Sequence, residues 1–137
     1  MRAVMDTNVL VAALRSRSGA SFEILRRLRL GEWTVVLSNH LLYEYEEILK
    51  RQASELGLSL EDVDELLNAI CARAEESVLS HEWQPILNDP DDEPLVQLTV
   101  ESGADCLVSH NIRDLAPAAG LGVQLLQPRE FLAKLRA

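Results

Sequence analysis

Three polar residues follow the first apolar segment of the chain, at a position where they could hold a metal ion. Ala3 to Met5 suit one short buried strand, and Asp6, Thr7 and Asn8 come directly after it. In a sheet of parallel strands, ligands bind beyond the carboxyl ends of the strands, where these side chains would lie. Their carboxylate, hydroxyl and amide oxygens can bind a metal ion or form hydrogen bonds. The same residue types also form turns and helix caps, so this motif needs further acids to indicate a site.

Further candidate ligands occur at comparable places in the second half of the chain. Asp92 opens a helical pattern within the acidic segment 88–93, and Asn111 and Asp114 follow a later apolar segment. In an alternating β/α chain, each helix starts on the side of the sheet where the strands end. We therefore expect Asp92, Asn111 and Asp114 to meet Asp6 at one edge of the sheet.

The helix expected over residues 40–51 offers another acid, but its spacing does not select one. At about 100° per residue, its apolar residues form one stripe, and Glu47 points away from that stripe. Glu44 and Glu46 lie on the two borders of the stripe. Periodicity alone allows either to be a site carboxylate, with the other a solvent-facing border residue. The stripe consists of Leu41, Leu42, Tyr45, Ile48 and Leu49.

The rest of the chain alternates between apolar segments that suit strands and amphipathic segments that suit helices. Ser59 with Asp62 resembles a capping box that opens a helix containing Val63, Leu66, Leu67, Ile70 and Ala74. This alternation predicts a three-layer α/β/α sandwich with a central parallel sheet, formed as a single domain over residues 1–137. The expected strands are 3–5, 34–37, 105–109 and 122–126; the other expected helices are 20–29, 40–51, 92–102 and one from Pro128 onward.

The net charge of −9 argues against a general nucleic-acid binder, because phosphate contacts need cations. Arginines are nevertheless concentrated close in sequence to Asp6. Arg26 and Arg29 fit the solvent-facing side of the helix expected over 20–29, whereas Arg15 and Arg17 lie in a polar segment better suited to reaching a phosphate backbone.

Other features of the sequence limit the class of protein to which the chain can belong. No segment approaches the roughly 20 apolar residues that a membrane span needs, and Met1 leads directly into a strand, so we expect a soluble, cytoplasmic protein. Cys71 and Cys106 lack CxxC neighbours and are interpreted as buried thiols. Trp33 and Trp83 suit either the core or an interface, and we assign both to the core.

No common catalytic motif competes with the acids. The chain contains no GxSxG elbow, GxxxxGK[ST] phosphate loop, HExxH pair or GxGxxG turn. His40, His81 and His110 are scattered and are interpreted as structural or solvent-facing, with His110 nearest to the expected site. An aspartyl phosphoacceptor is a weaker alternative, because Asp6 lacks a neighbouring second Asp and no lysine follows the last site strand.

Gathered carboxylates favour a hard divalent cation. Acids within about 4 to 6 Å raise one another's pKa, so such a cluster is costly unless a cation offsets its charge. Mg²⁺ or Mn²⁺ prefers oxygen ligands, and such ions promote phosphodiester hydrolysis by activating water and stabilising the leaving oxygen.

Taken together, these segments resemble the PIN domain family over nearly the whole chain. The resemblance rests on residues 5–10, on 37–38 leading into 42–45, on 89–93, and on 104–109 with the two residues Asn111 and Asp114. PIN domains are compact α/β/α ribonucleases that use Mg²⁺ or Mn²⁺, and short bacterial members are often VapC-like toxins of toxin–antitoxin pairs. The resemblance therefore implies an RNA substrate, an antitoxin protein partner and a homodimer. Single-stranded or loop RNA is favoured over duplex DNA, because a splayed backbone can enter an acidic groove where a metal ion offsets the repulsion.

Matched to the family motifs, Asp6 is the first metal-binding acid, Glu44 the second and Asp92 the third. The resemblance thus selects Glu44 as the site acid, whereas helical spacing alone did not distinguish Glu44 from Glu46. Many members have Asp where this chain has Asn111, which offers an oxygen without charge, and some share its Asn-then-Asp order with an acid like Asp114.

The expected site follows from this match. Asp6, Glu44, Asp92 and Asp114 are the expected catalytic acids, and the same four with Asn111 are the expected metal ligands. Asp89 and Asp91 are interpreted as loop-forming neighbours, Ser109 as a supporting hydroxyl and Asn8 as a residue that orients Asp6. The competing hypothesis is a non-catalytic binding module of the same fold with a degenerate metal site.

Overall fold

The computed structural model describes all residues 1–137 and contains a five-stranded sheet in which every strand pairing is parallel. The strand order is β3-β2-β1-β4-β5. Met5 in β1 pairs with Val108 in β4, so Asp6 and Ser109 leave adjacent strands at the same edge. The strands are β1 (Arg2–Met5), β2 (Thr34–Leu37), β3 (Ala74–Glu76), β4 (Cys106–Val108) and β5 (Leu125–Leu126).

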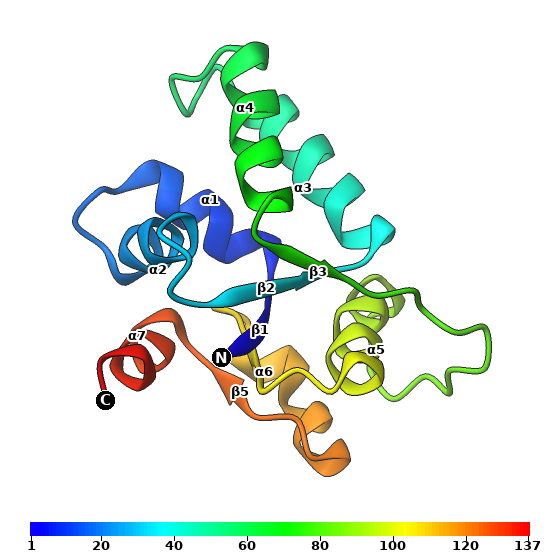
Figure 1. Cartoon of the computed structure of the whole chain (residues 1–137). Coiled ribbons are helices and arrows are strands. Elements are labelled where there is room, and N and C mark those ends of the chain that lie inside the picture. Colours follow the sequence, from blue (N-terminus) through cyan, green and yellow to red (C-terminus); the bar gives the residue numbers. More distant parts are fainter.

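Helices cover both faces of this sheet and confirm the predicted α/β/α layers (Figure 1). α5 packs against β1, β2 and β4, whereas α1 and α2 pack together on the other face with α7 beside α2. α3 and α4 lie side by side and project away from the sheet at the top of the view. The helices are α1 (Thr7–Arg15), α2 (Ala20–Arg29), α3 (Asn39–Gln52), α4 (Leu60–Cys71), α5 (Glu93–Ser102), α6 (Ile112–Leu115) and α7 (Pro128–Arg136), with 3₁₀ helices at Pro90–Asp92 and Ala116–Leu121.

Side-chain caps fix where two of the long helices begin. The Ser38 hydroxyl accepts a hydrogen bond from the Leu41 N–H at 3.1 Å and so caps the start of α3. Ser59 and Asp62 form the expected capping box at the start of α4. Such caps satisfy N–H groups that have no partner within the helix.

The core is one cluster of 32 buried hydrophobic residues built mainly from the strands and the inner helix faces. Trp33 belongs to it as predicted, donating its indole N–H to the Ile24 carbonyl oxygen at 2.9 Å and meeting Phe131 edge to face at 5.0 Å between ring centroids. Trp83 is only partly buried, against the expected core assignment. No helix is long and apolar enough to cross a membrane.

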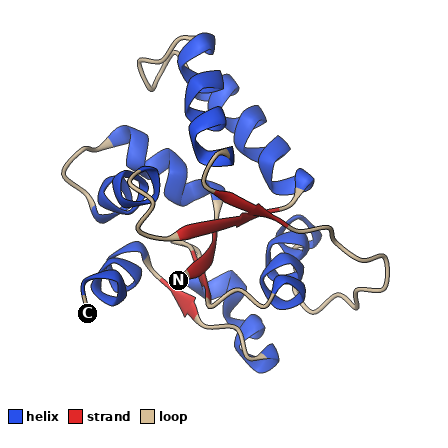
Figure 2. Cartoon of the chain, in the orientation of Figure 1, coloured by secondary structure: helices blue, strands red, loops and turns tan.

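Three sequence-based expectations about elements and burial were wrong. Residues 7–15 form α1, a helix that the sequence analysis did not predict. Its residues are almost all apolar, so no helical period is visible, and it begins within a motif that is typical of turns. Ala74 begins β3 rather than continuing α4, which ends at Cys71. The Cys71 residue is exposed because it lies at the helix end, while Cys106 is buried as expected. Figure 2 shows that the strands are short and that most of the chain forms helices and loops.

Candidate functional site

Asp6 lies at the end of β1 and forms the centre of a small hydrogen-bond network. The Ser109 hydroxyl donates to the Asp6 carboxylate at 2.6 Å, and the Asn8 side-chain amide donates to it at 3.3 Å. Burial raises the pKa of Asp6, the Ser109 hydrogen bond opposes this shift, and the nearby charge of Glu44 raises the pKa further. The geometry therefore gives Ser109 and Asn8 the supporting positions expected of them.

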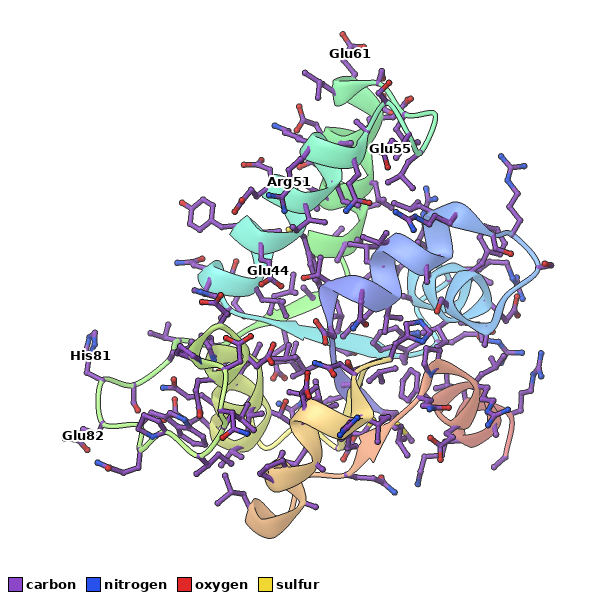
Figure 3. All side chains as sticks on the ribbon, turned by 180° about the vertical axis from the view of Figure 1, so that it is seen from behind. Glu44, Arg51, Glu55, Glu61, His81 and Glu82 are labelled. Carbon is purple, nitrogen blue, oxygen red and sulfur yellow. The ribbon has the colours of Figure 1, made fainter.

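Glu44 reaches the same edge of the sheet from α3. The Thr7 hydroxyl donates a hydrogen bond to the Glu44 carboxylate, and the neighbouring Tyr45 hydroxyl donates one to the Met5 carbonyl oxygen. In Figure 3, Glu44 lies near the sheet, whereas Arg51 lies farther along α3. These two contacts hold α3 against the residues on both sides of Asp6.

Asp92 comes to the site from the 3₁₀ turn that precedes α5. Its carboxylate accepts no hydrogen bond and forms no ion pair, although the residue is half-buried. Burial and the charges of Asp89, Asp6, Asp114 and Glu44 raise the pKa of Asp92 to about 6. The shared electrostatic influence shows that these acids gather in one region.

A cavity of about 20 Å³ is lined by Asp6, Glu44 and Asp92 together. That volume slightly exceeds the roughly 10–15 Å³ that one water needs, so the cavity suits a single water or ion. His40 also lines it, which the sequence interpretation did not foresee. The sequence does contain one indication of this position: His40 and Glu44 are four residues apart and therefore lie on the same face of the helix.

The remaining two predicted ligands lie outside this cavity. Asp114 is exposed on α6 and, with Asn88, Asp89 and Pro90, lines a separate open cavity of about 320 Å³. Asn111 donates its backbone N–H to the Ser109 hydroxyl oxygen at 2.9 Å, and its side chain makes no hydrogen bond. Three of the predicted acids thus line one cavity, and the charge of Asp114 contributes to raising the pKa of Asp92.

A buried carboxylate that sequence reasoning overlooked holds the loop before Asp92. Glu93 accepts hydrogen bonds from the Trp83 indole N–H at 2.8 Å and from the backbone N–H groups of Ile86, at 2.7 Å, and Leu87. Burial alone would raise the pKa of Glu93, but these donors outweigh it and lower the pKa. His81, in contrast, projects outward from the same loop, as its solvent-facing assignment predicts (Figure 3).

The donor set fits a hard divalent cation by its chemistry. Asp6, Glu44 and Asp92 offer only carboxylate oxygens, and no lysine or arginine forms an ion pair with any of them. No three acidic, histidine or cysteine side chains already surround a common point as metal ligands. Mg²⁺ uses only one or two carboxylates directly and keeps several waters, so a complete cage is not required.

Comparisons with known proteins agree with this architecture. The chain matches VapBC2 from Rickettsia felis, a structure bound to a DNA fragment from the promoter, with a TM-score of 0.64 and 17% identity over 93% of this chain and 98% of the other. It also matches a PilT N-terminus domain protein from the archaeon Sulfolobus solfataricus P2, with a TM-score of 0.54 and 16% identity over 98% and 93% of the two chains. No curated protein matches its sequence. The sequence profile of the PIN domain matches residues 2–113, and the chain therefore belongs to the PIN domain family.

Proposed function

We propose that this protein is a metal-dependent endoribonuclease that hydrolyses phosphodiester bonds in single-stranded or loop RNA. The observation that carries the proposal is the convergence of Asp6, Glu44 and Asp92 on one ion-sized cavity in a PIN domain. Mg²⁺ or Mn²⁺ bound there would supply Lewis-acid chemistry, activating a water for attack and offsetting negative charge on the phosphate.

The chain's own residues prepare the site for that chemistry. Ser109 and Asn8 orient the Asp6 carboxylate, and Thr7 orients that of Glu44. The Asp92 carboxylate accepts no hydrogen bond within the chain, so its oxygens are available to an incoming ion. In the reaction, water adds to phosphorus, the bond from phosphorus to the 3′ oxygen breaks, and that oxygen leaves with a proton. The products are a 5′ phosphate and a 3′ hydroxyl.

Splayed single strands suit this site better than a duplex. The cavity lies at the edge of the sheet beside an open groove of about 440 Å³ between α1 and α3, which Asp6 and Glu44 also line. An unpaired backbone can bend into such a groove, and a bound cation would offset repulsion between its phosphates and the acids.

The test is cleavage of a defined single-stranded RNA by purified protein in Mn²⁺ or Mg²⁺. We expect Asp6→Asn and Asp92→Asn each to lower the rate at least about 100-fold, since such changes remove charge stabilisation from the transition state. Glu47→Gln, which alters an exposed acid of α3 that does not line the cavity, is the matched control and should cleave normally. Unchanged cleavage by Asp6→Asn and Asp92→Asn would make the assignment wrong.

A non-catalytic module with a degenerate metal site is the second candidate, favoured by Asn111 at a position where an acid is common in the family and by the lack of a preformed ligand set. It predicts neither cleavage nor Mn²⁺ binding. Calorimetric titration with Mn²⁺ separates the two, because the ribonuclease proposal requires a binding event in the wild type that is lost in Asp92→Asn.

We further infer that the protein is the toxin of a toxin–antitoxin pair and forms a homodimer. The support is the fold shared with the VapBC2 structure at similar chain length. Expression of the wild type should arrest growth of a bacterial host, whereas Asp6→Asn should not. Co-expression of the protein encoded next to this gene should relieve the arrest, and light scattering should give twice the chain mass of 15.3 kDa.

A further inference from the structure

A second large cavity lies between the starts of α2 and α7, close to the acids but chemically unlike their surroundings. Its volume is about 500 Å³, and its polar lining includes Ser16, Ser21, His110, Gln127 and Arg129. None of its lining residues is Asp or Glu. The chain carries a net charge of −9, so a cavity of this size without an acid is unusual for this surface.

The neighbouring cavities differ in their charge. The 20 Å³ cavity, the groove between α1 and α3, and the cavity beside Asp114 each have at least two acids in their lining. A phosphate in any of these meets negative charge unless a cation is bound. In the cavity between α2 and α7, a phosphate meets no negative charge from the lining residues.

Arg129 gives this cavity a positive charge that no acid neutralises. Four other arginines of the chain form ion pairs with acids, namely Arg2, Arg26, Arg27 and Arg51, but Arg129 forms none. A guanidinium group matches the geometry of a phosphate and can bind it through two N–H groups. Its donors are therefore available to a ligand.

Hydrogen-bonding side chains stand opposite this arginine. The His110 ring lies 3.4 Å from the Ser21 hydroxyl, and both groups line the cavity together with the Ser16 hydroxyl. Side-chain donors of this kind commonly position a nucleic-acid backbone without reading its sequence.

Asn8 joins the cavity wall to the acids. It accepts the His110 backbone N–H at 3.2 Å and donates its side-chain amide to Asp6 at 3.3 Å. The same asparagine thus contacts a residue of each site. Asn8 therefore links His110, which lines the second cavity, to Asp6, which lines the first.

We propose that the cavity between α2 and α7 binds a backbone phosphate of the substrate RNA beside the one that is cleaved. Arg129 supplies the charge, and His110 and Ser21 supply hydrogen bonds. This inference rests on the proposed ribonuclease function and adds a second contact to the groove between α1 and α3, at the place where the RNA passes α2 and α7.

The test measures binding of a fluorescein-labelled 12-nucleotide oligouridylate by anisotropy, in the Asp92→Asn background to prevent cleavage. We expect Arg129→Ala to weaken binding about 5- to 20-fold at low salt and to reduce the slope of log affinity against log salt by about 1. His110→Ala should weaken binding less. Arg136→Ala, an exposed arginine on the same helix, is the matched control and should bind normally. Thermal unfolding verifies that each variant is folded.

Two results would overturn the inference. One is unchanged affinity in Arg129→Ala. The other is a loss of affinity in Arg15→Ala alone, because Arg15 lines the groove between α1 and α3 and its side chain donates only to the neutral Gln52. Uridine monophosphate should compete only weakly; if it binds as tightly as the oligonucleotide, the cavity is a mononucleotide site and the inference is wrong.

Cleavage assays in the wild-type background separate this inference from the proposed function. If the wild type cleaves RNA and Arg129→Ala has the same KM, the phosphate site is wrong while the ribonuclease stands. If Arg129 is needed for RNA binding but the wild type cleaves nothing in Mn²⁺, the phosphate site stands and the ribonuclease is wrong.

Discussion

The buried Tyr45 hydroxyl donates a hydrogen bond to the backbone carbonyl oxygen of Met5 and thereby ties α3 to the end of β1. Each partner is adjacent in sequence to a site acid, Tyr45 to Glu44 and Met5 to Asp6. A single buried contact between two elements therefore sets how closely those carboxylates approach. Burial and the charges of Asp6 and Glu44 raise the pKa of Tyr45 well above its ordinary value, which keeps the hydroxyl protonated and able to donate this hydrogen bond.

Replacing Tyr45 with Phe should destabilise the protein and loosen the site without removing any acid. Loss of one buried hydrogen bond is expected to lower the free energy of unfolding by about 1 to 2 kcal/mol. Urea unfolding measures this change, and Tyr43→Phe is the control because Tyr43 is 71% exposed. Equal stability of the two variants would contradict a structural role for the Tyr45 hydroxyl.

Replacing Ser109 with Ala should weaken metal binding through Asp6. The Ser109 hydroxyl lowers the pKa of Asp6 against the effect of burial, so its removal raises that pKa and lets protons compete better with the ion. We expect about a 10-fold loss of Mn²⁺ affinity at pH 6.5, and a smaller loss at pH 8, where fewer protons compete with the ion. Calorimetry at the two pH values tests this. A loss independent of pH would mean that the hydroxyl acts only by orienting the carboxylate.

Asp92→Asn should stabilise the metal-free protein at neutral pH. The folded-state pKa of Asp92 is raised from 3.8 to about 6, so the folded protein binds this proton more tightly than the unfolded chain. The ionised carboxylate therefore costs stability above pH 6, and that cost disappears as the pH falls toward 4. After allowance for solvent screening, we expect a gain of about 1 kcal/mol at pH 7.5 and none near pH 4.

Denaturant unfolding of the wild type and Asp92→Asn in EDTA, across pH 4 to 8, measures this difference. Asp91→Asn is the control and should follow the wild type. With saturating Mn²⁺ the order should reverse, because an ion that binds only the folded wild type stabilises it. A mutant that is less stable than the wild type in EDTA at pH 7.5 would contradict the prediction.

Glu93→Gln should release the loop that precedes Asp92. The buried Glu93 carboxylate is stabilised by its N–H donors, which lower its pKa below the ordinary value of 4.5. That stability is present above pH 4.5 and is lost as the pH falls through the lowered folded-state pKa. We expect the mutation to cost about 2 kcal/mol at pH 7 and progressively less below pH 4.

Unfolding curves at the two pH values measure the cost, and Trp83 fluorescence reports on the loop. Glu82→Gln is the matched control, since Glu82 is an exposed residue of the same loop (Figure 3). A destabilisation as large at low pH as at neutral pH would show that the charge of Glu93 contributes nothing to the loop.

The sequence by itself determined the architecture and the positions of the acids along it. Alternation of apolar and amphipathic segments predicts a parallel sheet with helices on both faces. The carboxyl ends of parallel strands share one edge, so Asp6 and Ser109, which each follow a strand, are expected at that edge. The start of α4 could likewise be predicted from the sequence, because a capping box involves residues that are only three positions apart.

Only the tertiary structure decided which side chains meet. Glu44 and Glu46 are equivalent by helical period, and packing of α3 on β1 through Tyr45 brings Glu44 to Thr7. In the sequence, Glu93 cannot be distinguished from the neighbouring acids. The structure shows that it is buried and accepts hydrogen bonds from Trp83 and Ile86, earlier in the loop. Contacts between residues far apart in the chain, and the burial that accompanies them, are not encoded in any local spacing, which is why these assignments required the fold.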